Sequence, residues 1–191
     1  MKDEGAEATV VFLHWGDEYK IQENNYQNTM AQKLCDLGVD VIVGGHPHVI
    51  QPMELLTSAQ DPAHRTVCIY SVGNALSNQR IHEMDLKTGH TEDGVIFSVT
   101  FEKPYEGDVY LSRVEVLPTW VNLSEVNGKL EYNILPLEDS RRGEWKELFN
   151  LTDELYANCE KSYDRTMALL SPGLEEVNAW LAQEAGLREA Q

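Results

Sequence analysis

The chain has 191 residues, 42% of them hydrophobic and 25% charged, and a formal net charge of −17. This length is enough for one domain with a sizeable core, and the composition is ordinary for a soluble globular protein. The acidic balance argues against nucleic-acid binding and against adhesion to an anionic membrane. No apolar run approaches the roughly 18–20 residues that a membrane-spanning helix needs, and the first five residues lack a signal-peptide pattern. An anionic substrate would need local positive charge, which a metal ion could supply.

The first part of the chain predicts a βαβ unit. Residues 8–13 (ATVVFL) form an unbroken run of β-branched and apolar residues, and residues 39–43 (VDVIV) predict a second strand of the same kind. Both are typical of strands buried on both faces of a parallel sheet. Residues 26–37 have helical spacing between them, and Gly38 follows as a C-terminal stop. The predicted inner face of this helix consists of Met30, Leu34 and Leu37. Short joins make the two strands parallel neighbours with a right-handed crossover.

The sequence then changes character. Residues 66–71 predict a third strand, and residues 94–102 and 109–117 alternate like antiparallel neighbours. Residues 130–137 predict a further strand, and residues 78–93 a mobile loop. The predicted fold class is therefore α/β: a βαβ unit plus a mixed or antiparallel sheet, followed by C-terminal helices.

The C-terminal part has a helical pattern from residue 143 onward. It contains an apolar stripe that we expect to serve packing, formed by Trp145, Leu148, Phe149, Leu155, Tyr156, Cys159 and Tyr163. Ser171 and Pro172 predict the start of a last helix, as its cap and first residue. The inner face of that helix is predicted to be Leu174, Val177 and Leu181. We expect one unit over residues 1–140, with the helical segment 141–191 packed on it.

The three cysteines are widely spaced and form no Cys-x-x-Cys pair. Cys35 and Cys68 lie in apolar segments, which indicates core positions. The sequence therefore predicts neither a disulfide framework nor a cysteine–zinc site.

Three histidines follow predicted strands. His14 comes directly after the first strand, and His46 and His48 come after the second in a Gly-Gly-His-Pro-His run. Parallel strands end at the same carboxyl edge of a sheet, where open α/β sheets bind ligands. We therefore expect the three imidazoles to converge, although a single histidine after a strand is more often structural. The other histidines, His64, His82 and His90, are interpreted as surface or loop residues.

The spacing of the pair suggests how metal ions would be held. Pro47 favours an extended conformation at His46, and histidines two apart in an extended chain point to different sides. They would then reach two neighbouring ions, about 3.5–4 Å apart as in paired-metal hydrolases. A mononuclear zinc site with three histidines is an open alternative. Imidazole suits zinc, iron or manganese better than calcium.

Three segments carry distinctive motifs. Residues 11–19 (VFLHWGDEY) contain His-Trp-Gly-x-Glu-Tyr, residues 38–54 contain Gly-His-Pro-His-Val-x-Gln-Pro-x-Glu, and residues 70–74 are YSVGN. The first two resemble segments of the bacterial capsule synthesis family CapA, which serves poly-γ-glutamate biosynthesis, and the third is similar to that family's Tyr-Ser-Leu-Gly-Asn segment. The resemblance covers about residues 8–137. The resemblance implies a fold related to that of calcineurin-like metallophosphoesterases, which is an αββα sandwich. This chain would form about half of such a sandwich.

The resemblance also implies site roles. The metal ligands would be His14, His46 and His48, with the first two sharing one ion and His48 reaching the other. Glu18 and His48 are the candidate catalytic residues, although Glu18 could equally be an exposed carboxylate at a turn. The candidate substrate residues are Gln51 and Asn74, and Asn74 could instead shape its turn. The family's early Gly-Asp and Asn-Asn-His motifs are not found in this sequence, so a bridging carboxylate and further ligands are missing.

The leading hypothesis is therefore a capsule (poly-γ-glutamate) biosynthesis protein with an incomplete metal-dependent hydrolase-type site. Divalent zinc, manganese or iron would be the cofactor, and an anionic polymer or phosphoester the substrate. The alternative hypothesis is a non-enzymatic module that binds its missing N-terminal half or a membrane synthase. The resemblance implies a cell-surface location, which the chain itself does not encode.

Overall fold

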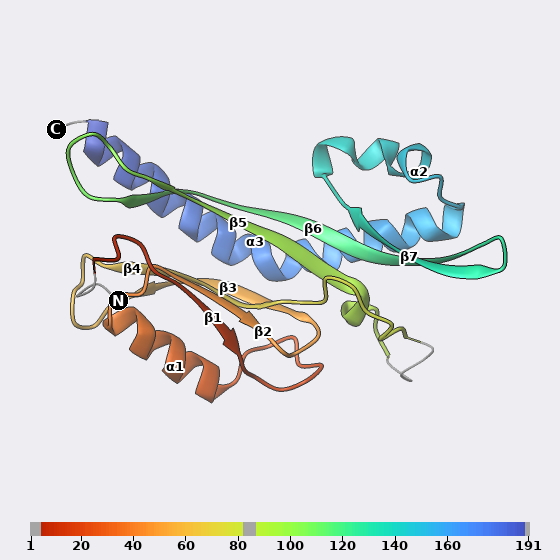
Figure 1. Cartoon of the computed structure of the whole chain (residues 1–191), viewed down its shortest axis with the longest axis horizontal. Coiled ribbons are helices and arrows are strands. Elements are labelled where there is room, and N and C mark those ends of the chain that lie inside the picture. Colours follow the sequence, from red (N-terminus) through yellow and green to blue (C-terminus); the bar gives the residue numbers. More distant parts are fainter. Residues whose placement is uncertain (1–4, 82–86, 190–191) are drawn as a thin grey trace.

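The computed structural model describes residues 5–81 and 87–189, arranged as two sheets with helices. The four-stranded sheet has the order β1 (Val10–His14), β2 (Val41–Gly45), β4 (Arg65–Val72) and β3 (Ile50–Thr57). The three-stranded sheet has the order β5 (Asp93–Glu102), β6 (Tyr110–Val126) and β7 (Lys129–Pro136). Helix α1 (Asn25–Asp36) lies on one side of the four-stranded sheet and the second sheet lies on the other (Figure 1). The predicted α/β class is confirmed.

The βαβ prediction is also confirmed. Strands β1 and β2 pair in parallel with α1 between them, and β2 pairs in parallel with β4. Asn24 caps α1 through a capping box with Gln27, and Gly38 follows the helix at a φ of 82°. The prediction that Leu37 lies on the inner face of the helix is wrong, because Leu37 is the C-cap residue and is 78% exposed. The buried residues of α1 are Gln27, Ala31 and Cys35.

Strand β1 is an edge strand of the described sheet, and the prediction that it is buried on both faces is wrong because the side chains of one face are exposed. Among the described residues it pairs only with β2. Val11 and Leu13 pack under α1, but on the opposite face Val10 is 39% and Phe12 is 76% exposed. An apolar run shows that a strand could be buried on both faces; it does not show what lies beside the strand.

Strand β3 was not predicted. It follows the histidine loop directly and pairs antiparallel with β4, so it closes the other edge of the sheet. Its Pro52 is tolerated there because an edge strand has one side free of ladder hydrogen bonds. The predicted antiparallel strands of the second sheet are present, and β6 extends nine residues beyond the predicted end at Leu117, to Val126.

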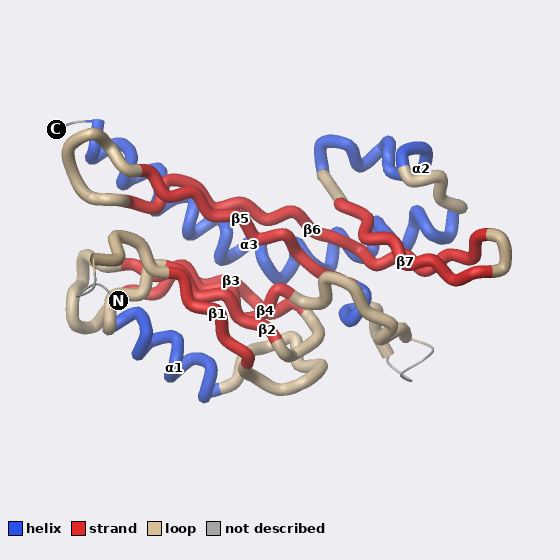
Figure 2. Tube along the Cα trace, in the orientation of Figure 1, coloured by secondary structure: helices blue, strands red, loops and turns tan. Residues whose placement is uncertain are grey.

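The C-terminal helices differ from the prediction at one boundary. A short 3-10 helix η3 (Asp139–Glu144) and α2 (Trp145–Leu148) precede α3 (Asp153–Glu189), which continues through Pro172. The predicted new start at Ser171 is therefore wrong. Tertiary packing explains the continuity: Leu170, Val177 and Leu181 on both sides of Pro172 lie in one core with both sheets. Figure 2 shows α3 as one long helix.

Helix α3 contacts β3 of one sheet and β6 of the other, so it ties the two sheets together. Its aromatic N-terminal part packs with α2 on β6 and β7, as predicted for six of the seven residues of the apolar stripe. The prediction is wrong for Leu148, which is 46% exposed. The division of the chain near residue 140 remains a prediction. All three cysteines are buried and free. In the described part of the chain, no helix combines the length and apolar character needed to cross a membrane.

Part of segment 78–93, which was predicted to be a mobile loop, is buried in the protein. Arg80, Thr91 and Glu92 are buried, and His90–Glu92 form a short 3-10 helix, η2. Residues 82–86, including His82, lie outside the described residues, so the predicted mobility of this segment remains a prediction.

The docking of α3 on β3 depends on Gly173. A Cβ at this position would lie 2.0 Å from the Met53 carbonyl oxygen, whereas a Cβ at Gly186 of the same helix would meet nothing. We expect Gly173→Ala to lower the free energy of unfolding by about 1–2 kcal/mol, because overpacking outweighs the gain of about 1 kcal/mol in helix propensity. Gly186→Ala should keep that gain. Urea unfolding of both variants checks this, and equal stabilisation by the two would contradict it.

Candidate functional site

The structure brings the three predicted histidines together at the carboxyl edge of β1 and β2. The ring centroids of His14 and His46 are 4.4 Å apart, and those of His46 and His48 are 6.3 Å apart. Two backbone hydrogen bonds hold the two loops side by side: Trp15 donates to the Gly45 carbonyl at 3.0 Å, and Tyr19 donates to the Pro47 carbonyl at 2.7 Å. The convergence follows from the parallel register, in which His14 lies opposite Gly45.

Trp15 anchors the first loop in the core. Its indole crosses β2 and donates from Nε1 to the Tyr70 carbonyl of β4 at 2.8 Å. The crossing point is Gly44, where a Cβ would lie 2.3 Å from Trp15 Nε1 and 2.0 Å from the Tyr70 oxygen. A glycine is therefore required at position 44. The close approach of the Trp15 indole and the Tyr70 carbonyl explains the first glycine of the Gly-Gly-His-Pro-His run.

The histidine loops have unusual backbone conformations. The φ angles of Tyr19, His46 and His48 are 63°, 105° and 60°, in the left-handed region that non-glycine residues rarely adopt. The prediction that Pro47 makes His46 extended is therefore wrong, because the loop geometry overrides the local preference. Each such residue costs about 1–3 kcal/mol, and such strain clusters at functional sites.

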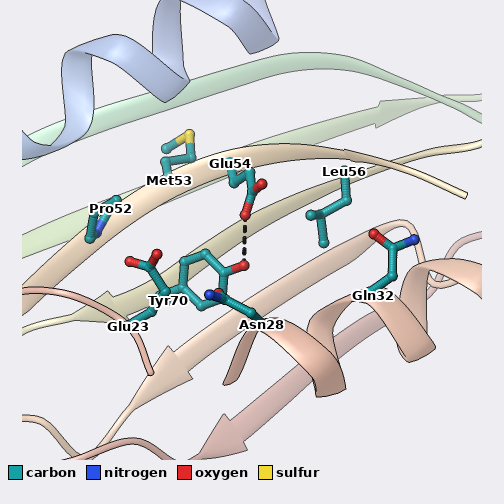
Figure 3. A pocket seen from close by; sticks show the side chains of 8 residues that line it. All are labelled: Glu23, Asn28, Gln32, Pro52, Met53, Glu54, Leu56 and Tyr70. Carbon is teal, nitrogen blue, oxygen red and sulfur yellow. Dashed lines mark hydrogen bonds between the residues drawn. The ribbon is translucent and has the colours of Figure 1, made fainter. Parts of the chain in front are cut away.

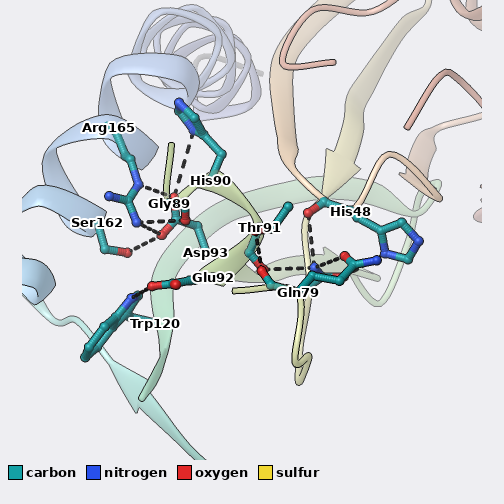
Figure 4. Close-up of polar contacts among 11 residues, drawn as sticks. His48, Gln79, Gly89, His90, Thr91, Glu92, Asp93, Trp120, Ser162 and Arg165 are labelled. Atoms are coloured by element: carbon teal, nitrogen blue, oxygen red, sulfur yellow. Dashed lines mark hydrogen bonds and ion pairs between the residues drawn. The ribbon is translucent and has the colours of Figure 1, made fainter. Parts of the chain in front are cut away.

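Asn74 fixes the tautomer of His48. Its Nδ2 faces three oxygens: the His48 carbonyl at 3.1 Å, Gln79 Oε1 at 3.1 Å and the Thr91 carbonyl at 2.9 Å (Figure 4). Nδ2 must be the donor there, so Asn74 Oδ1 is the acceptor that lies 3.0 Å from His48 Nδ1. His48 therefore carries its proton on Nδ1 and keeps the Nε2 lone pair free. This is the arrangement of a ligating histidine held by a neighbouring acceptor.

Glu18 lies on the free side of His48. Its Oε1 is 3.8 Å from His48 Nε2, and its side chain is half exposed. The Tyr19 ring stacks on the His48 ring with centroids 6.0 Å apart. Glu18 can thus accept a proton or contact an ion beside His48, and both roles stay predictions.

Gln51, predicted as a substrate residue, is fully buried. Its Nε2 donates to the carbonyls of Lys20 at 2.9 Å and Gln22 at 3.0 Å, and its Oε1 accepts from Gln27 at 2.8 Å. Its amide is therefore engaged in holding the loop that follows Glu18 against α1. The geometry favours a structural role for Gln51, as it favours a positioning role for Asn74.

A polar network that was not predicted continues from Asn74 to α3. Asn74 N donates to the Asp93 carbonyl at 3.0 Å, and the Asp93 carboxylate accepts from Ser162 Oγ at 2.6 Å and Arg165 Nη2 at 2.5 Å. Figure 4 shows this group beside Trp120, whose Nε1 donates to Glu92 at 3.2 Å. Burial raises the pKa of Asp93 to about 6, although Arg165 and Ser162 oppose the shift. No local pattern reveals such a contact, since 72 positions separate Asp93 from Arg165.

Glu54, the last residue of the second motif, lines a polar cavity of about 370 Å³ between α1 and β3. It accepts from the Tyr70 hydroxyl at 2.7 Å, and Glu23 and Asn28 line the same cavity (Figure 3). Burial, followed by this hydrogen bond, raises the pKa of Tyr70 well above its ordinary value. Because the cavity lies beside α1, Glu54 is not grouped with the histidines.

The fit of these residues to metal ions is partial. His14 and His46 form one close pair, and His48 with Glu18 forms another. Within residues 5–81 and 87–189, however, no three histidine, cysteine or acidic side chains are placed to hold one ion. One carboxylate would also leave two divalent cations far from neutral. Metal binding by these residues therefore remains a prediction.

Comparison with known proteins finds similarity in the part of the chain that contains the histidine motifs. Residues 1–79 match the family described as bacterial capsule synthesis protein PGA_cap. The PGA biosynthesis protein CapA of Bacillus subtilis is 40% identical over 74 residues, which are 39% of this chain and 18% of that protein. The capsule biosynthesis protein CapA of Bacillus anthracis is 35% identical over 78 residues, 41% of this chain and 17% of that protein.

The matched segments thus span less than a fifth of either relative. The family match contains every predicted site residue, from His14 to Asn74. Strands β5–β7 and helix α3 lie outside it.

Proposed function

Since residues 1–79 of this chain are CapA-like, we propose that the protein acts in the synthesis of a bacterial poly-γ-glutamate capsule. Its part would be a metal-dependent hydrolase-type site to which His14, His46 and His48 contribute. The substrate would be the anionic polymer or a phosphoester. The observation that supports this most strongly is the convergence of three imidazoles on strained loops.

A bound zinc, manganese or iron ion would activate water and stabilise charge on the substrate oxygen. His14 and His46 would hold one ion, and His48 would present Nε2 to the other. Asn74 keeps the His48 proton on Nδ1 and therefore away from that ligand atom. Glu18 would receive a proton from the attacking water, because its Oε1 lies 3.8 Å from His48 Nε2.

The proposed site needs further ligands, and the fold leaves room for them. The free edge of β1 adjoins His14, so a strand paired along this edge would end beside the histidines. Exposed Phe12 and Val10 would be covered by the same addition. We propose that additional polypeptide completes both the sheet and the site.

The histidines can be tested directly in the chain as it is. We expect wild-type protein dialysed against zinc or manganese to retain the ion, and His46→Ala to lower its affinity about tenfold or more, the change expected from losing one of few ligands. His64→Ala is the matched control, because His64 is bonded to the Val39 carbonyl and is remote from the loops. Metal content and titration calorimetry are the measurements. Equal binding by wild type and His46→Ala would defeat the assignment.

A second candidate function is a non-enzymatic module that binds a partner through β1. The exposure of Phe12, 76% on a strand with an open edge, favours it. The same titration separates the two candidates, since a module of this kind would retain no zinc or manganese in any variant.

A further inference from the structure

A second cavity lies far along the chain from the histidines, between the β6–β7 hairpin and the start of α3. It has a volume of about 540 Å³, within the range of about 300–1,000 Å³ that small-molecule sites occupy. Its floor contains Asn122 and Asn133, which lie directly opposite each other in the β6–β7 register. Asn150, from the segment between α2 and α3, lines it too. Three amides from three segments therefore meet in one hollow.

Asn122 is the lining residue with an unpaired hydrogen-bond acceptor. The residue is 94% buried, with a relative exposure of 6%, and its Oδ1 has no hydrogen-bond partner in the part of the chain that the structure describes. A buried acceptor without a donor costs about 1–3 kcal/mol. An apolar side chain such as leucine or valine at this position of β6 would avoid this cost. Oδ1 itself is closed to water in this structure, so a ligand hydroxyl would remove this cost once the Asn122 amide turns towards the cavity.

The remaining lining restricts the kind of ligand. The apolar lining includes Phe149, Leu151 and Leu155. Glu125 is the charged residue among the lining, and neither lysine nor arginine belongs to it in the described chain. An anion would meet a carboxylate and no cation, so a neutral ligand is favoured.

We propose that this cavity binds a neutral sugar. A sugar ring carries hydroxyl groups that both donate and accept, which matches amides that offer donors and acceptors at short spacing. Its C–H face provides the apolar surface that Phe149 and the leucines would bury. The cavity lies outside the segment that matches the capsule family, and the proposal does not depend on the proposed metal site.

The test uses the whole chain and three neutral probes: maltotriose, a galactose trisaccharide and tri-N-acetylchitotriose. Ligand-observed NMR should show saturable binding of at least one of them, and the trisaccharide of galacturonic acid should not bind. Asn122→Leu and Asn133→Leu should each weaken that binding about tenfold, as expected for one lost hydrogen bond. Asn127→Gly, in the exposed hairpin turn at a φ of 53°, should bind like wild type.

A thermal melt accompanies the titration. Asn122→Leu should raise the melting temperature of the free protein, because it replaces an unpaired buried acceptor by an apolar group. A variant that is more stable yet binds less cannot be explained by loss of folding. Failure of all three neutral probes, equal binding of the acidic trisaccharide, or unchanged binding by Asn122→Leu would each overturn the proposal.

Discussion

Arg165→Met is expected to lower the free energy of unfolding by about 3–5 kcal/mol at pH 8, the cost of removing one partner of a buried ion pair. The Asp93 side chain is 1% exposed, and Arg165 is its counter-charge through two nitrogens. Without the guanidinium, the carboxylate keeps only the Ser162 hydroxyl and the weaker approach of His90, whose Nδ1 is 4.0 Å away. Chemical denaturation at fixed pH measures the loss.

The loss should shrink as the pH falls. Burial raises the pKa of Asp93 from an ordinary 3.8 to about 6 even with Arg165 present. A carboxyl whose pKa is higher in the folded than in the unfolded protein contributes stability below about 3.8, and this contribution is lost as pH rises through about 6. Removing Arg165 raises that folded pKa further, while protonation of His90 would supply a cation. The gap between variant and wild type should therefore narrow between pH 8 and pH 5.

Two further variants make this test specific. Arg113→Met removes an arginine from a surface pair with Glu115, with 67% and 54% of the two side chains exposed, and should cost at most about 1 kcal/mol. Asp93→Asn in the Arg165→Met background should restore part of the stability, because the unpaired charge is then gone. An Arg165→Met loss as small as that of Arg113→Met, or one independent of pH, would show that the pair is not the strong link between α3 and β5.

The convergence of His14, His46 and His48 could be predicted because it depends on a rule of topology. Two parallel strands joined by one helix end at one edge, so residues that directly follow them meet. The position of Gly38 just after the end of α1 was likewise predictable from local chemistry. Such features depend on residues close to each other in sequence.

The features that the sequence did not reveal depend on neighbours. The same apolar run describes a central strand and an edge strand, so the exposure of Phe12 could not be predicted from its own segment. Gln51 and Asn74 lie in two separate motifs, whose resemblance to the family suggested substrate contacts. Their amides instead satisfy carbonyls and a ring nitrogen contributed by other loops. Pro172 is a helix-boundary signal that packing on β3 overrides.

Gly44→Ala should have the second large effect, with the free energy of unfolding lowered by about 2–4 kcal/mol. The added Cβ would lie 2.0 Å from the Tyr70 carbonyl and 2.3 Å from the Trp15 indole, so backbone or ring must move. Overpacking in a core costs about 1–3 kcal/mol, and the lost Trp15–Tyr70 hydrogen bond adds about 1 kcal/mol. Gly45→Ala is the matched control, since its Cβ would meet nothing within 4 Å and should change stability by less than about 0.5 kcal/mol.

Gly44→Ala and Gly45→Ala also test what would position the histidines for the proposed metal binding. Gly45 is the residue next to His46, so any general sensitivity of the loop to side chains would make Gly45→Ala the more harmful change. The structure predicts the reverse, because Trp15 follows His14 directly and its indole is seated on Gly44. Zinc titration of both variants, at a temperature where both are folded, should show weaker binding by Gly44→Ala alone. Equal binding by the two would mean that the indole anchor does not set the position of His14 relative to His46.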